Sequence, residues 1–340
     1  IYFTTGLLKY INSPEALIGV IAHEIGHIEN YHISKRKKSL KDLQIINHLG
    51  NLTAIASSII TKNPDILIQT SVANKLGIQN YYSSFSKNQE KEADLFAIER
   101  LNILEISSKD LRKFLEFLES ESFKKGISKE SFKFSTHPNY EERLDLISTF
   151  ANNNYNYIDP AINQNFKFIK SKLFGYTENN INVLENYLNY EYAKYGKAIM
   201  LSNQGRLLES LKLINELIND FPYYYYLLET KADILYNHSY TKEAEKFYKI
   251  SLSKNSGNNY IKKRLFEIEY NKLNFEDSDL VHQIFINYQD LIFIFSNNLI
   301  FYKKWKKILN SLKKDDWDMF VDAKIDLLNK NNKNAIDKIQ

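Results

Sequence analysis

The sequence predicts a mainly α-helical protein, and three observations carry this prediction. Glycine (10) and proline (5) are scarce among the 340 residues, which favours long helices over a strand-rich fold with many turns. Ser13 followed by Pro14 is typical of a helix start. Residues 197–214 resemble residues 231–248 at an offset of 34 positions, which is the period of a repeat built from paired helices.

Composition excludes several classes of protein. The 340 residues are enough for two domains that each bury a core. A net charge of +4 is too mild for a dedicated nucleic-acid binder. The absence of cysteine excludes disulfides and thiolate metal ligands. The sequence also has no apolar run of the roughly 20 residues that a membrane-spanning helix needs.

The first long helix is expected to run from Ser13 to Lys38 and to bind a metal. His23 and His27 lie four residues apart, so both imidazoles share one helix face and can reach one ion. Glu24, beside His23, can accept a proton from zinc-bound water, because zinc lowers the pKa of that water to about 7. This H-E-x-x-H pattern predicts a hydrolytic zinc site. The alternative is two solvent-facing histidines on an amphipathic helix.

A third ligand is expected from a separate helix, because a catalytic zinc takes three protein ligands and leaves one position for water. Ser86 is a suitable N-cap for that helix. Glu90 and Asp94 then share a helix face, whereas Glu92 points elsewhere. We therefore predict Glu90 as the third ligand and Asp94 as a residue that holds a ligand imidazole by its other nitrogen. An ordinary acidic helix start is the alternative.

These motifs resemble a known family. H-E-I-G-H at residues 23–27, followed by E-K-E-A-D at residues 90–94, resembles the zinc peptidases that include HtpX and the CAAX prenyl proteases. Residues 1–8 resemble the strand and turn that lead into the active-site helix of that family, and T-H-P at residues 136–138 with Arg143 resembles its late T-H-P-x-x-x-x-R element. Residues 166–173 and the repeats after them resemble its periplasmic branch, the beta-barrel assembly-enhancing proteases.

The resemblance implies a zincin-type (gluzincin) metallopeptidase domain with a small β element, followed by an α-α tetratricopeptide-like superhelix. It implies one Zn²⁺ per chain, bound by His23, His27 and Glu90, with Glu24 as the general base. The family has further strand and helix sequence before residue 1, so we expect the N-terminal part of this domain, and any signal peptide, to lie outside this chain.

His137 and Arg143 are further site residues implied by the resemblance. His137 would lie near the metal, where it either occupies the open position in a resting state or helps to bind the oxyanion during catalysis. Arg143 would be a structural or substrate-binding residue beside the site. From the sequence alone, a histidine before a proline, as at Pro138, is also typical of a helix entry.

The expected function is hydrolysis of peptide bonds in misfolded or stalled envelope proteins of a bacterial periplasm. Its partners would be protein or peptide substrates and, through the repeats, the outer-membrane assembly machinery, with no nucleic acid. The alternative is a zinc-stabilised chaperone or scaffold whose latent protease activity is blocked by His137. The basic runs 35–38 and 303–307 are either solvated helix faces or points of peripheral membrane contact.

We expect three regions along the chain. Residues 1–150 would form the metallopeptidase domain, in which residues 39–85 form a helical hairpin that could cover the cleft. Residues 151–185 would be a helical connector. Residues 186–340 would form the tetratricopeptide-like domain, whose concave surface could hold extended segments of other proteins.

Overall fold

The computed structural model describes residues 3–39, 41–42, 87–124, 140–150, 155–187, 189–295 and 297–338. These residues are mainly helical, and no β-strand is present among them. The strand and turn expected at residues 1–8 are replaced, from Thr5 onward, by the helix α1 (Thr5–Tyr10). The Thr4 hydroxyl accepts the Leu7 N–H at 3.1 Å and caps this helix, which explains why the residues after Thr4 are helical. The predicted lid at residues 39–85 lies almost wholly outside the described residues.

The chain divides into two compact units, residues 1–170 and 171–340, and the division falls within α7 (Pro160–Thr177). The three regions expected from the sequence stay a prediction. The helices of the first unit, besides α1 and α7, are α2 (Pro14–Glu29), residues 32–39, residues 87–103, α5 (Lys109–Lys124) and α6 (Tyr140–Phe150). We call residues 87–103 the Glu90 helix. None of the described helices is long and apolar enough to cross a membrane.

Helix α2 begins where the sequence predicts. The Ser13 hydroxyl accepts the Ala16 N–H at 3.1 Å, and Pro14 occupies the first helical position. The prediction of one helix over residues 13–38 is wrong, however, because α2 ends at Glu29. Tyr31 has a left-handed backbone with φ of 56°, and a new helix starts at residue 32. The basic run 35–38 therefore belongs to this second helix.

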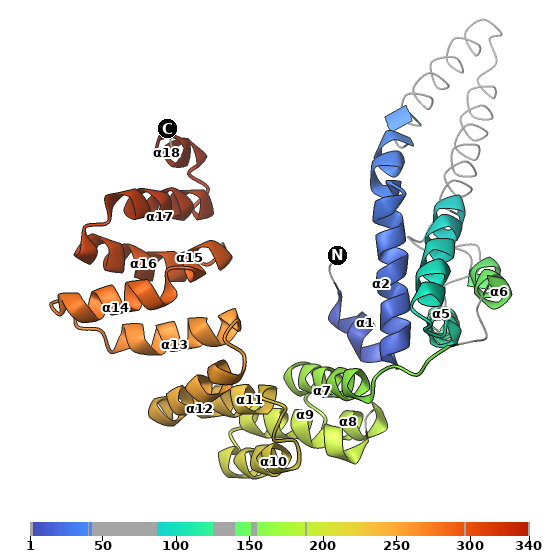
Figure 1. Ribbon diagram of the computed structural model, residues 1–340, viewed down its shortest axis with the longest axis horizontal. Helices are drawn as coiled ribbons and strands as arrows, with labels where there is room; N and C mark the ends of the chain where they lie inside the picture. The colour runs from blue at the N-terminus through green and yellow to red at the C-terminus, as the bar shows by residue number, and fades with distance from the viewer. Residues whose placement is uncertain are drawn as a thin grey trace, which may run out of the picture. The chain divides into compact units, whose positions relative to one another are not determined.

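Helix α2 packs against its neighbours (Figure 1), and two of its glycines allow a close approach. A Cβ atom placed on Gly26 would lie 3.0 Å from the Ala93 Cα and 3.1 Å from the Ala93 carbonyl oxygen, both on the Glu90 helix. A Cβ atom on Gly19 would lie 3.0 Å from Leu111 of α5. Gly26, the glycine of H-E-I-G-H, thus lets the two ligand-bearing helices approach each other.

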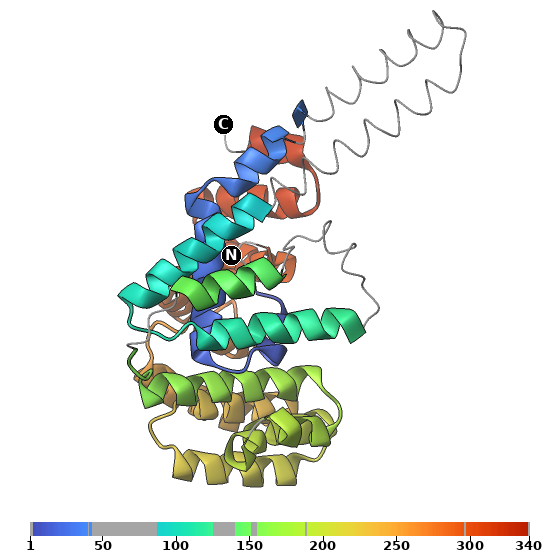
Figure 2. The same cartoon turned by 90° about the vertical axis from the view of Figure 1, so that its right-hand side faces the viewer.

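Two apolar clusters hold the helices of the first unit. One joins the Glu90 helix, α5 and α6, and Figure 2 shows α5 and α6 lying next to each other. Its buried members are Ile98, Leu101, Leu111, Leu115 and Ile147. The other joins the start of α2 to α5 and α7 through Ile11, Ala16, Phe114 and Phe166. Both clusters position the two helices that carry the candidate site.

The second unit is a succession of helices, most of them packed in neighbouring pairs (Figure 1). They are α8 (Ile181–Tyr187), α9 (Tyr190–Asn203), α10 (Leu207–Asp220), α11 (Tyr226–Asn237), α12 (Thr241–Lys254), α13 (Asn259–Asn271), α14 (Ser278–Tyr288), α15 (Leu291–Ile294), α16 (Leu299–Leu312), α17 (Asp315–Leu328) and α18 (Asn332–Asp337). Gly205 (φ 79°) and Ser239 (φ 67°) form the left-handed turns of the pairs α9–α10 and α11–α12 at the predicted offset of 34. The tetratricopeptide-like superhelix stays a prediction.

Aromatic residues fill the core of the second unit. Phe266 stacks on Trp305 with ring centroids 4.9 Å apart, and Phe301 and Tyr302 are buried beside them. Phe301 and Tyr302 are therefore packing residues of this core. Trp305, in the middle of the basic run 303–307 of α16, is buried in the core, whereas the four lysines of this run are partly or fully exposed.

Candidate metal centre

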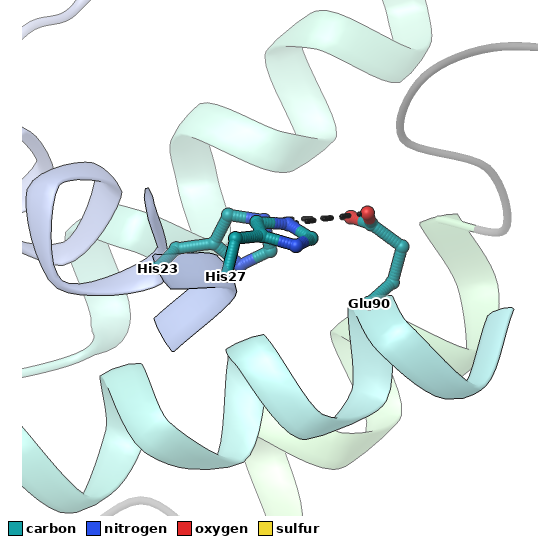
Figure 3. A group of neighbouring side chains, drawn as sticks. All are labelled: His23, His27 and Glu90. Carbon is teal, nitrogen blue, oxygen red and sulfur yellow. Dashed lines mark hydrogen bonds and ion pairs between the residues drawn. The ribbon is translucent and has the colours of Figure 1, made fainter. Parts of the chain in front are cut away.

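Three side chains of the first unit point at one another from two helices (Figure 3). His23 and His27 come from α2, and Glu90 comes from the first turn of the Glu90 helix. The two histidine Nε2 atoms are 3.0 Å apart, and the Glu90 carboxylate oxygens lie 3.4 Å from the first and 3.3 Å from the second. Zinc bonds of 2.0–2.1 Å in a tetrahedron place ligand atoms about 3.3 Å apart. The three distances between nitrogen and oxygen atoms of this group, two of which end on different Glu90 oxygens, are close to this value.

The donor set also suits a divalent cation. His23, His27 and Glu90 are 5%, 7% and 1% exposed, so a carboxylate is held out of water beside two imidazoles. Burying a carboxylate is costly unless charge or hydrogen bonds compensate for it. Arg143 Nη1, which lies 3.5 Å from Glu90 Oε2, offsets part of that cost, and an ion among the ligand atoms would offset more of it. Two imidazoles with one carboxylate are one of the donor sets of catalytic zinc.

Asp94 and Arg143 hold His23 on the Nδ1 side of its ring, away from the other ligands. The Nδ1 atom of His23 lies 2.8 Å from Asp94 Oδ1. Arg143 donates from Nε to Asp94 Oδ2 at 2.7 Å and from Nη2 to Asp94 Oδ1 at 2.8 Å. A proton on Nδ1 of His23 leaves the Nε2 lone pair facing the metal position. Both Asp94 and Arg143 are buried, so this ion pair fixes the ring rigidly.

The charges around His23 shift its pKa and that of Asp94 in opposite directions. Burial lowers the pKa of His23, but the Asp94 and Glu90 carboxylates outweigh it and raise the pKa above 6.5. Burial raises the pKa of Asp94, but the Arg143 guanidinium outweighs it and holds the pKa below its usual value. Asp94 is therefore a carboxylate at neutral pH and accepts the hydrogen bond from His23.

His32 and Glu92 support His27 in a way that the sequence analysis did not anticipate. The Nδ1 atoms of His27 and His32 lie 2.8 Å apart, and His32 Nε2 lies 2.8 Å from Glu92 Oε2. Glu92 points away from the ligand triangle, as its helical position predicts, yet it reaches the metal site through His32. The helix break at Tyr31 creates this contact, and no residue spacing in the sequence indicates it.

Of the remaining predicted site residues, Glu24 lies in the described part of the chain and His137 does not. Glu24 lies on α2, partly exposed, directly after His23. His137 lies outside the described residues, so its proximity to the metal stays a prediction. Beside the ligands is a cavity of about 300 Å³ between the Glu90 helix and α6. Glu90, Asp94 and Arg143 line it together with Lys87, Lys91 and Glu142, among others.

Comparison with known proteins agrees with this geometry. Residues 1–151 match peptidase family M48. The chain is 25% identical over 243 residues to a beta-barrel assembly-enhancing protease of Yersinia pestis, and 24% identical over 243 residues to one of Escherichia coli (strain K12). These alignments cover 68% of this chain and 48% of each relative, so the chain spans about half the length of the curated relatives that it matches. The part of the chain that carries the candidate metal centre, residues 1–151, is therefore similar to the peptidases of family M48.

Proposed function

We propose that this chain is a zinc-dependent endopeptidase. The observation that carries the proposal is the buried group of His23, His27 and Glu90, in which the two Nε2 atoms are 3.0 Å apart and the Glu90 oxygens Oε2 and Oε1 lie 3.4 Å from His23 Nε2 and 3.3 Å from His27 Nε2. These three residues would hold one Zn²⁺. When bound, zinc lowers the pKa of water to about 7 and polarises a substrate carbonyl.

The neighbouring side chains of this chain would supply the remaining functions. Asp94 would keep the proton of His23 on Nδ1, and Arg143 would keep Asp94 in place. Glu24 would take a proton from the attacking water on a carboxylate oxygen and pass it to the leaving amide nitrogen. His137 would act near the metal, either by blocking access at rest or by donating to the oxyanion during catalysis.

The substrates that we propose are misfolded or stalled envelope proteins of the periplasm. The support is the similarity to two proteins named beta-barrel assembly-enhancing protease. The helix pairs α9–α10 and α11–α12, related by 34 residues, would belong to a tetratricopeptide-type region that recruits substrates or the outer-membrane assembly machinery.

Casein cleavage by the full chain and by Glu24→Gln tests the proposal. We expect both proteins to bind one zinc, and we expect cleavage to fall by roughly 10²–10⁴-fold in Glu24→Gln because the general base is lost. Glu29→Gln is the matched control, since Glu29 is exposed at the end of α2 and should leave cleavage unchanged. If wild type cleaves casein and Glu24→Gln cleaves it equally well, Glu24 is not the general base.

A further inference from the structure

We propose that His32 and Glu92 are positioning residues for the metal site. In this arrangement His32 accepts the Nδ1 proton of His27, and Glu92 accepts the Nε2 proton of His32. The Nε2 lone pair of His27 is thereby kept facing Glu90. The inference rests on the proposed metal site, and it concerns how this chain prepares one ligand of that site.

Distances and burial define the path. The two contacts, His27 Nδ1 to His32 Nδ1 and His32 Nε2 to Glu92 Oε2, are both 2.8 Å, well within hydrogen-bonding distance. His32 is 1% exposed, whereas the Glu92 side chain is 51% exposed. The path therefore leads from a buried ligand, through a buried imidazole, to a carboxylate at the surface.

Only one placement of protons satisfies this path with neutral imidazoles. A neutral imidazole carries one proton, on either Nδ1 or Nε2. The Glu92 carboxylate can only accept, so that proton belongs on Nε2 of His32. Nδ1 of His32 must then accept, and Nδ1 of His27 must donate. The one remaining lone pair of His27 is on Nε2, which lies 3.3 Å from Glu90.

The fold supports His32 independently of these hydrogen bonds. Tyr31, with its left-handed backbone, ends the preceding turn and places His32 at the start of the next helix. Gln89, the residue before Glu90, donates from Nε2 to the His32 carbonyl oxygen at 3.2 Å. Gln89 is 3% exposed, so this contact is held in the interior. The Glu90 helix thus holds His32 at its backbone through Gln89 and at its ring through Glu92.

His23 and His27 are supported by different acids with different surroundings. His23 contacts Asp94 directly, and Asp94 is buried and paired with Arg143. His27 is connected to Glu92 through His32, which contacts both residues. Removal of an outer partner of a metal-binding histidine typically weakens metal affinity by 10–100-fold. The His32 path can therefore be tested by metal affinity without altering a ligand.

The experiment measures zinc affinity of the full chain by competition with a chromophoric chelator. We expect His32→Ala to bind zinc about 10–100-fold more weakly. His32→Asn should recover most of the affinity, because its Oδ1 stands where Nδ1 stood and can accept from His27. Glu92→Ala should also weaken binding, whereas Glu92→Gln keeps an acceptor and should bind nearly as well as wild type.

Non-additivity separates positioning from a general loss of structure. If Glu92 acts only through His32, Glu92→Ala should have no further effect in the His32→Ala background. Glu92 is half-exposed, so Glu92→Ala should leave the urea midpoint of the zinc-free chain unchanged and serves as the test if His32→Ala does not fold. Glu99→Ala, an exposed acid on the same helix, is the matched control.

Two results would overturn the inference. If wild type binds zinc and the His32→Ala and Glu92→Ala variants bind it equally well, the positioning role fails and the proposed peptidase stands. The same holds if His32→Asn is no better than His32→Ala. If wild type itself takes no zinc from the chelator, both the inference and the proposed function fail.

Discussion

At the scale of single residues, each histidine of the candidate site is held by a partner on its far nitrogen. The spacing of four residues predicts His23, His27, Glu90 and Asp94, because side chains four apart on a helix share a face. The same rule gives no signal for His32, since its partner Glu92 lies 60 residues away in the sequence and the contact depends on a backbone turn. Local periodicity predicts the ligands and Asp94, whereas the role of His32 depends on a tertiary contact.

The buried residue Lys170, which contacts the chain just before α2, makes the free energy of unfolding depend on pH. Lys170 donates to the Ile11 carbonyl oxygen at 2.7 Å, and burial lowers the pKa of its ammonium to about 8 from 10.5. Between these values the unfolded chain holds more protons than the folded one, so the free energy of unfolding rises with pH across that window.

We expect the urea midpoint, followed by circular dichroism, to increase from pH 8 to pH 10 in wild type. This slope should be smaller in Lys170→Met, which cannot take up the proton. Lys113→Met, at a lysine with a 73% exposed side chain and a raised pKa, should keep the slope. A slope that is the same in Lys170→Met and wild type would show that Lys170 does not cause it.

At the scale of helices, the site depends on how closely α2 approaches the Glu90 helix. The sequence predicts the start of α2 correctly through Ser13 and Pro14, because capping is local. It does not predict the end at Glu29, because no glycine or proline marks the break and Tyr31 rarely adopts a positive φ. Gly26 is part of the sequence motif, but its role in helix packing is apparent only from the structure, in which a Cβ atom on Gly26 would contact Ala93.

Gly26→Ala should therefore destabilise the protein, although alanine is the better helix former by about 1 kcal/mol. Its Cβ would meet Ala93 backbone atoms at 3.0–3.1 Å, which forces the two helices apart. We expect a loss of about 1–3 kcal/mol in the free energy of unfolding and weaker zinc binding. Gly6→Ala in α1 is the control, because its nearest neighbour would be 3.9 Å away and stability should not fall. A Gly26→Ala variant as stable as Gly6→Ala, with unchanged zinc affinity, would contradict this account.

At the scale of the whole chain, composition and the offset of 34 residues predict helices that the structure contains, whereas the family resemblance predicts a strand and turn at residues 1–8 that are replaced by a helix from Thr5 onward. Scarcity of glycine and proline predicted a mainly helical chain, and the described residues are mainly helical. The offset of 34 predicted equivalent helices, and α10 and α12 lie at that offset. The strand and turn expected by resemblance at residues 1–8 gave way to α1 from Thr5, because Thr4 caps a helix there. The division at residue 170 falls inside a helix, where no composition change marks it.

The measurement that tests the central claim most directly is the zinc content of the full chain and of Glu90→Gln after equilibrium dialysis. The account predicts one zinc per wild-type chain. It predicts a strong loss of zinc in Glu90→Gln, because a neutral amide replaces the one charged ligand in a buried site. Glu99→Gln should bind as wild type does. A wild-type chain without zinc, or a Glu90→Gln variant that holds zinc as tightly as wild type, would contradict the assignment of His23, His27 and Glu90 as the metal site.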